Sequence, residues 1–298
     1  MKNRVSPGSL SGEPHHRRNN PYMLRALLTP LLNLAARYPL PVLLAGVFCF
    51  QSLLAGVPPL SGDEAFYWEW SRHPDLAYYS HPPMVAWLIG ASTWLFGTHE
   101  FSVRLPAIVL QMATVALVWR MGYELGGKRF ALWAGGLYAL LPLSVVFGSM
   151  ITTDRGLIFF WALAAWGVKQ AVVDGRRGYW YGAGLALGGM LLSKFFAFLF
   201  FPSVGAWLLA HPRHRRQWIT KEPYLAFGLA LLVFAPFLYW NATHDWMTFQ
   251  FNLVSRHQNE GLNLEKPLVY LAGQMLAASP AAFWMMAVAA LGFGGGGV

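Results

Sequence analysis

Residues 40–70 read LPVLLAGVFCFQSLLAGVPPLSGDEAFYWEW, an apolar run followed by an acidic and aromatic segment. The apolar run, from about Leu40 to Val57, can cross a hydrocarbon core of roughly 30 Å with slight thinning. Pro58 and Pro59 end it, because proline disrupts a helix interior. We interpret the run as an uncleaved first transmembrane span rather than a signal peptide, because the preceding tail is too long for a signal n-region and more spans follow.

The composition of the whole chain is typical of a membrane protein. Of the 298 residues, 56% are hydrophobic and only 12% are charged, whereas a soluble domain has about 25% charged residues. A single cysteine, Cys49, excludes a disulfide framework and a cysteine-based zinc site. The net charge of +9 could indicate nucleic-acid binding, but its placement between apolar runs indicates membrane topology instead. We therefore expect the lipid bilayer, and no nucleic acid, as a partner.

Seven further apolar runs predict seven more spans. They cover residues 102–120, 130–148, 156–170, 179–192, 195–210, 223–240 and 267–292. With a cytoplasmic N-terminus, 16 of the 22 Lys and Arg residues lie inside, as the positive-inside rule requires. Nine of the 13 acidic residues then lie outside, which indicates that the polar chemistry is external.

The predicted fold class is therefore all-α, a polytopic membrane bundle of about eight transmembrane helices. Residues 1–39 are expected to form a flexible basic cytoplasmic tail, and residues 40–293 the transmembrane domain. The short runs at 179–192 and 195–210 could instead form one long kinked helix. That alternative would put the neighbouring arginine clusters on opposite sides of the membrane, so we prefer two spans with Lys194 at the outer surface.

The first external loop, residues 58–101, contains the most informative residues. Ser61 followed by Glu64 is a capping-box pattern, which predicts a short helix with Asp63 in its first turn. The aromatic residues that follow are typical of an interfacial helix, and the apolar segment 83–97 predicts a second interfacial or re-entrant helix. The acidic pair could be an ordinary helix start; in an aromatic setting at the membrane surface, a partly desolvated carboxylate also suits base catalysis.

Two stretches of this loop resemble a known family. GDEAFYW at 62–68 and YSHPP at 79–83 are similar to the first periplasmic loop of integral-membrane GT-C glycosyltransferases. Within these, the similarity is to family 39, the protein O-mannosyltransferases, and to the bacterial transferases that attach aminoarabinose to lipid A. The resemblance covers most of the chain from about residue 40 onward and extends to VRLP at 103–106, TTD at 152–154, LSK at 192–194 and WN at 240–241.

The resemblance implies a GT-C helical bundle in the bacterial inner membrane, with its active site on the periplasmic face. It implies a polyprenyl-phosphate sugar donor and, as acceptor, an envelope glycolipid, glycan or protein. Asp63 is then the catalytic carboxylate of an inverting transfer, and Asp154 assists acceptor or cation binding. Family members generally continue further, so the C-terminal part is expected to be missing beyond the Gly-rich residues 294–298.

Two departures from the family pattern concern candidate site residues. His81 precedes the proline pair where the lipid A enzymes have an acidic residue followed by lysine. Arg155 follows Asp154 where the family usually has a small or apolar residue, and it could pair with Asp154.

The remaining candidates are polar residues of the outer face. Outer-face cations could hold the donor phosphate through charge-assisted contacts, or could be snorkelling side chains that anchor span ends. A divalent cation is a possible cofactor, with Asp63, Asp154 and His81 as ligands, although no fixed ligand spacing supports it. The candidate substrate-binding residues are Glu64, Tyr67, His81, Arg104, Lys194, His244 and Arg256.

Two alternatives to an enzyme remain open. A transporter or flippase of lipid-linked sugars would need ionisable residues near mid-membrane. A non-catalytic assembly protein would leave Asp63 and Asp154 unexplained.

Overall fold

The computed structural model describes residues 29–30, 33–255, 265–279, 284 and 288. The expected basic tail lies mostly outside these described residues, and so do Arg256 and the Gly-rich residues 294–298. Helices and turns make up the described part of the chain, and no strand occurs in it. The all-α prediction is confirmed.

The structure contains eleven described α-helices and two short 3-10 helices, η1 and η2, in the part of the chain with assigned elements. Their bounds are α2 Pro39–Ala55, α3 Gly62–Arg72, α4 Met84–Phe96, α5 Glu100–Leu140, α6 Pro142–Ser149, α7 Thr153–Val172, α8 Tyr179–Leu191, η1 Phe195–Leu199, α9 Phe200–Ala210, η2 Arg215–Ile219, α10 Glu222–Thr243, α11 Met247–Leu253 and α12 Glu265–Ala278.

Helix is found in each of the eight predicted spans, at least in their described residues. Two helices, α5 and α10, are long and apolar enough on their own to cross a membrane. The shorter apolar helices are α2, α4 and the η1–α9 segment. The number of crossings therefore stays a prediction.

Helix α5 covers the predicted span 102–120 and the start of the next one. Gly126 and Gly127 leave the helical conformation between them, within the connection predicted at 120–129, and Gly127 has φ 70°, a value that glycine adopts without steric cost. The expected single span at 130–148 is divided at Leu141, whose backbone is extended (φ −57°, ψ 136°). Pro142 explains this break, because a proline excludes the helical conformation from the residue before it.

The break between α8 and α9 occurs where the sequence predicts it. Helix α8 ends at Leu191, and Lys194 has an extended backbone before η1 begins. This geometry fits two separate helices and not one long kinked helix.

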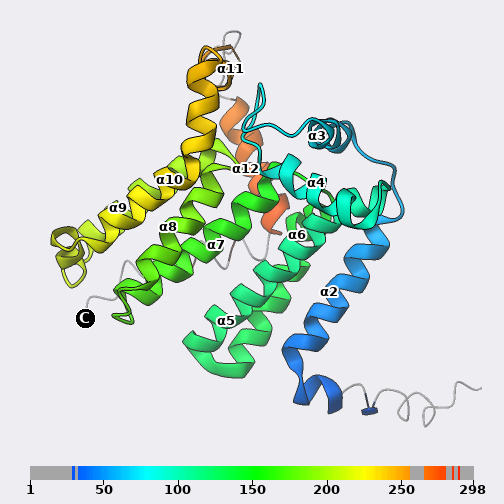
Figure 1. Ribbon diagram of the computed structural model, residues 1–298. Helices are drawn as coiled ribbons and strands as arrows, with labels where there is room; N and C mark the ends of the chain where they lie inside the picture. The colour runs from blue at the N-terminus through cyan, green and yellow to red at the C-terminus, as the bar shows by residue number, and fades with distance from the viewer. Residues whose placement is uncertain (1–28, 31–32, 256–264, 280–283, 285–287, 289–298) are drawn as a thin grey trace, which may run out of the picture.

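The connecting segments collect at two ends of the bundle. Figure 1 shows the α7–α8 and α9–α10 connections together at the lower left, while α3, α4 and α11 lie at the other end, toward the top. Between them α8 packs closely on α10, where an added Cβ at Gly184 would lie 2.3 Å from the carbonyl oxygen of Ala226. Small residues allow this backbone approach, as is common between membrane helices.

Candidate active site

The start of α3 forms the capping box that the sequence predicts. Ser61 Oγ accepts a hydrogen bond from the backbone N–H of Glu64 at 3.3 Å, and Glu64 Oε2 accepts one from the backbone N–H of Ser61 at 3.0 Å. Asp63 lies in the first turn with its residue exposed. The partial positive charge of the helix N-terminus favours a carboxylate there.

Glu64 and Arg104 form a buried ion pair beneath Asp63. Arg104 Nε donates to Glu64 Oε1 at 2.9 Å, and Arg104 Nη2 donates to Glu64 Oε2 at 2.8 Å. The Glu64 side chain is 0% exposed and the Arg104 side chain is 1% exposed. The other three N–H groups of the guanidinium donate to the carbonyl oxygens of Ala55, Pro58 and Pro59 at 2.6–2.8 Å. All five donors of the guanidinium are therefore used within the protein.

The ion pair ties the end of α2, the Pro58–Pro59 linker and the start of α3 to the second turn of α5. Neither member has the exposure that a contact with substrate would require. The sequence predicts that both residues bind substrate. Their burial indicates instead that Glu64 and Arg104 hold Asp63 in position.

Glu64 also contacts the segment that leads into α7. Its Oε1 accepts a hydrogen bond from the backbone N–H of Ile151 at 3.2 Å. Burial raises the pKa of Glu64, but hydrogen bonds from Arg104, Ser61 and Ile151, together with the positive charge of Arg104, outweigh burial and hold the pKa below its usual value. Glu64 is therefore ionised at neutral pH.

Asp154 pairs with Lys194 and not with Arg155. Lys194 Nζ lies 2.6 Å from Asp154 Oδ1, and both side chains remain accessible, at 24% and 39% exposure respectively. Arg155 is buried and donates from Nη1 to Gln111 Oε1 at 2.6 Å. The suggested Arg155–Asp154 pair is thus corrected, because successive residues of a helix point in different directions.

His81 lies among aromatic rings of the first loop. Its ring centroid is 5.9 Å from that of Tyr67 and 6.0 Å from that of Trp70, and its Nδ1 is 2.9 Å from Ser80 Oγ. Tyr67 is buried on the inner side of α3. Three residues beyond His81, the backbone N–H of Met84 donates to the carbonyl oxygen of Leu192 at 3.1 Å. The loop containing His81 is thereby joined to the turn that carries Lys194.

Helix α11 covers the same loop, which the sequence reading did not anticipate. Thr248 Oγ1 donates to the carbonyl oxygen of Tyr78 at 2.9 Å, and Asn252 Nδ2 donates to that of Ser80 at 2.9 Å. Asn241 Oδ1 in turn accepts from the backbone N–H of Thr248 at 3.2 Å. No local sequence pattern predicts contacts between residues about 170 positions apart.

His244 is used locally at the end of α10. Its ring stacks on that of Trp240 at 4.1 Å, and its Nδ1 lies 2.8 Å from the carbonyl oxygen of Trp240. No hydrogen bond, ion pair or ring contact among the described residues joins it to Asp63 or Asp154. Among the residues that the structure describes, no group of three His, Cys, Asp or Glu side chains is arranged to hold a metal ion.

The fold and site together define a class of protein. An all-helical membrane bundle with an acidic, aromatic first loop and a second aspartate at the start of a later helix is the architecture of the integral-membrane GT-C group. Residues 80–240, more than half of the chain, match the family of the dolichyl-phosphate-mannose-protein mannosyltransferases. The chain belongs to this family.

Individual relatives agree with this placement. The chain is 31% identical over 226 residues to the lipid A galacturonosyltransferase RgtD of Rhizobium johnstonii, an alignment that covers 75% of this chain and 47% of that protein. It is 28% identical over 178 residues to an undecaprenyl phosphate-alpha-4-amino-4-deoxy-L-arabinose arabinosyl transferase of Edwardsiella ictaluri, covering 57% of this chain and 32% of that one. The chain thus spans about half of the first relative's length and a third of the second's.

A solved structure shares the fold. The crystal structure of ArnT from Cupriavidus metallidurans in the apo state superimposes with a TM-score of 0.63 at 19% identity, over 77% of this chain and 46% of that one. The similarity confirms the predicted GT-C fold.

Proposed function

We propose that this chain forms the membrane part of a glycosyltransferase that moves a sugar from a polyprenyl-phosphate donor to an acceptor at the periplasmic face of a bacterial inner membrane. The observation that carries the proposal is the exposed Asp63, presented by a helix start that the buried Glu64–Arg104 pair fixes to the bundle. The relatives' names support this chemistry, because one acts on lipid A and the other uses an undecaprenyl phosphate sugar.

Asp63 acts as the catalytic base. The acceptor hydroxyl gives its proton to the carboxylate as its oxygen attacks the anomeric carbon, and the bond from that carbon to the phosphate oxygen breaks. The polyprenyl phosphate leaves with the bonding electrons, and a single displacement inverts the anomeric centre. The transition state resembles an oxocarbenium ion, so positioning and charge stabilisation do most of the work.

Lys194 holds the departing phosphate. Its ammonium group has three N–H donors, and Asp154 occupies one of them at 2.6 Å. The two others can reach a phosphate oxygen, since the side chain remains 24% exposed. Asp154 thus orients the lysine, and the pair receives the negative charge that develops on the leaving group.

A flippase of lipid-linked sugars is the second candidate function. The arrangement favours a transferase, because Asp63, Asp154 and Lys194 all lie at helix starts and not in the middle of long helices. A transporter would need such groups near mid-membrane.

The experiment uses the full-length protein in liposomes with a radiolabelled polyprenyl-phosphate sugar and an envelope glycolipid extract. A transferase releases polyprenyl phosphate and moves the label into a new glycosidic product. Movement of the intact labelled donor between leaflets with no new product would reject sugar transfer in favour of the flippase.

A further inference from the structure

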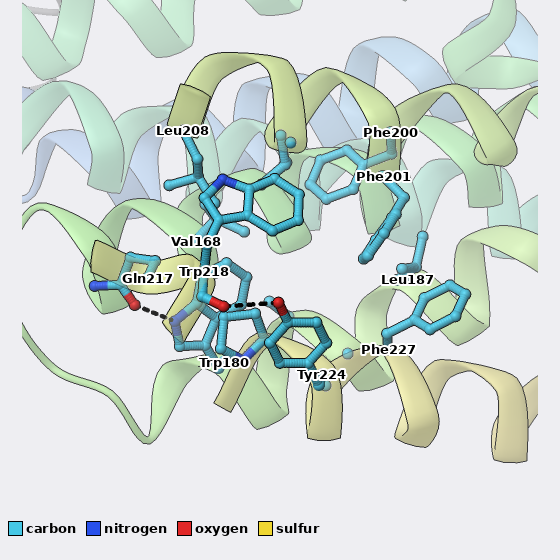
Figure 2. A pocket seen from close by; sticks show the side chains of 16 residues that line it. Val168, Trp180, Leu187, Phe200, Phe201, Leu208, Gln217, Trp218, Tyr224 and Phe227 are labelled. Atoms are coloured by element: carbon cyan, nitrogen blue, oxygen red, sulfur yellow. Dashed lines mark hydrogen bonds between the residues drawn. The ribbon is translucent and has the colours of Figure 1, made fainter. Parts of the chain in front are cut away.

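A narrow apolar cavity lies at the end of the bundle opposite α3 and α4. It is enclosed by α7, α8, α9, α10 and η2, and its volume is about 50 Å³ (Figure 2). That volume accommodates about four water-sized groups, at roughly 10–15 Å³ each. The wall is almost wholly hydrocarbon, and none of the candidate active-site residues lines it. Side chains of the wall include Leu187, Phe200, Phe201, Leu208 and Phe227.

Aromatic side chains on the outside of the bundle border the cavity. Phe201 and Phe227 have ring centroids 4.5 Å apart and are 39% and 37% exposed, and Tyr224 is 55% exposed. Figure 2 shows these rings along one side of the cavity. In a protein of a membrane family, aromatic rings exposed on the outside of the bundle meet lipid chains. A hydrocarbon chain can therefore approach the cavity from the bilayer.

The indole of Trp218 lies across the cavity and supplies a polar group. An added Cβ at Gly205 would lie 3.4 Å from this ring, so the glycine allows the indole to pack against α9. Trp218 Nε1 is buried and has no hydrogen-bond partner among the residues that the structure describes. By contrast, Trp180 Nε1 donates to Gln217 Oε1 at 3.3 Å. An unpartnered buried N–H donor favours a ligand that carries an acceptor oxygen.

The segment around the cavity is strongly basic. Arg213, Arg216 and Lys221 are exposed, and their charged groups form no hydrogen bond or ion pair within the described part of the chain. They flank Gln217, Trp218 and Pro223 of the cavity wall in sequence. Basic side chains beside a pocket between membrane helices, at the end of the bundle predicted to be cytoplasmic, can recognise anionic lipid head groups.

We propose that this cavity binds an anionic glycerophospholipid. The end of one acyl chain enters the cavity beside the contacting rings of Phe201 and Phe227, and the phosphate lies against Arg213, Arg216 and Lys221. A polyprenyl phosphate has similar chemistry, but a donor whose head group is at Asp63 cannot place that head at the opposite end of the bundle. The proposal does not depend on sugar transfer.

Native mass spectrometry of the delipidated full chain tests the proposal. The protein is titrated with phosphatidylglycerol, phosphatidylcholine and polyprenyl phosphate, and we expect phosphatidylglycerol to bind about tenfold or more tighter than phosphatidylcholine. The double variant Arg213→Gln/Arg216→Gln should reduce this preference to about twofold. The matched control Arg37→Gln/Arg129→Gln removes two exposed arginines outside the cavity and should retain it.

A second variant tests the cavity itself. Gly205→Leu places a side chain against the Trp218 ring and should weaken binding of both phospholipids, with the secondary structure checked by circular dichroism. If Gly205→Leu does not fold, the lipid preference of Arg213→Gln/Arg216→Gln alone tests the proposal. Equal binding of the two phospholipids, an unchanged preference in Arg213→Gln/Arg216→Gln, an equal loss in the control, or displacement of bound phosphatidylglycerol by polyprenyl phosphate would each overturn the proposal.

Discussion

Replacing Arg104 with methionine should destabilise the protein by about 3–5 kcal/mol, the cost of leaving one member of a buried ion pair without its partner. The variant keeps an unbranched apolar stem but removes the guanidinium group, which leaves the Glu64 carboxylate without two of its hydrogen bonds and the carbonyl groups of Ala55, Pro58 and Pro59 without donors. Glu64 would retain the backbone N–H groups of Ser61 and Ile151. The start of α3 should therefore loosen while the remainder of the bundle stays folded.

The pH dependence of this loss has a definite sign. In the native protein the pKa of Glu64 is lowered, so its contribution to stability is present above the usual glutamate pKa of 4.5 and is lost as the pH falls through the lowered value. In Arg104→Met, burial favours the protonated acid, because no positive charge remains beside it. The difference in stability between the two proteins should therefore shrink as the pH falls from 7 to below 4.5.

Pulse proteolysis in detergent micelles measures this difference at several pH values, and a double-mutant cycle with Glu64→Gln isolates the pair. The double variant Glu64→Gln/Arg104→Met should lose less stability than the sum of the single variants. The matched control Arg72→Met removes an exposed arginine of α3 that pairs with Glu69 on the surface, and it should cost at most about 1 kcal/mol. A loss below that value for Arg104→Met, or additive single losses, would refute the reasoning.

Three further predictions concern the donor site, the helix packing and the topology. Lys194→Gln should raise the KM for the lipid donor more than tenfold in a sugar-transfer assay, because the phosphate loses a charge-assisted contact; an unchanged KM would remove this residue from the donor site. Gly184→Val should destabilise the bundle by about 1–3 kcal/mol in a thermal unfolding assay, since its Cβ would meet the backbone of Ala226 at 2.3 Å, and a neutral effect would contradict this packing. In a chain without its native cysteine, Asp75→Cys should react with an impermeant maleimide in intact spheroplasts, whereas Arg216→Cys should react only after lysis; the reverse pattern would invert the predicted orientation.

Matched variants accompany these three measurements. Lys128→Gln removes an exposed lysine far along α5 from the proposed site and should leave the donor KM unchanged. Gly182→Ala adds a Cβ where nothing lies within 4 Å, so it should be neutral or slightly stabilising. Thr98→Cys, in the first loop, should label like Asp75→Cys.

The sequence predicts the local features of the first loop because their causes are local. The capping box at Ser61 and Glu64 depends on residues three positions apart, and it sets the start of α3. The apolar segment 83–97 predicts α4 to within a residue at each end. Pro142 also explains the break at Leu141, although the hydrophobic pattern alone predicts a continuous helix there.

The contacts that assemble the candidate site could not be predicted in this way. Glu64 and Arg104 are 40 residues apart, and their pairing depends on how α3 packs against the second turn of α5. The same holds for Asp154 and Lys194, which are also separated by 40 residues. Charge patterns along the sequence identify such residues as candidates, but only the packing of the helices distinguishes a buried structural arginine from an accessible lysine.

The most direct test of the central claim is sugar transfer by Asp63→Asn in the full-length protein. Glu69→Gln removes an exposed carboxylate of the same helix, outside the proposed site, and is its matched control. We predict that Asp63→Asn inserts into the membrane and has the same unfolding temperature as the native protein. Its kcat should fall at least about 100-fold, the usual contribution of general base catalysis. The control should retain native turnover, and transfer by Asp63→Asn at a rate near that of the control would contradict the claim that Asp63 is the catalytic carboxylate.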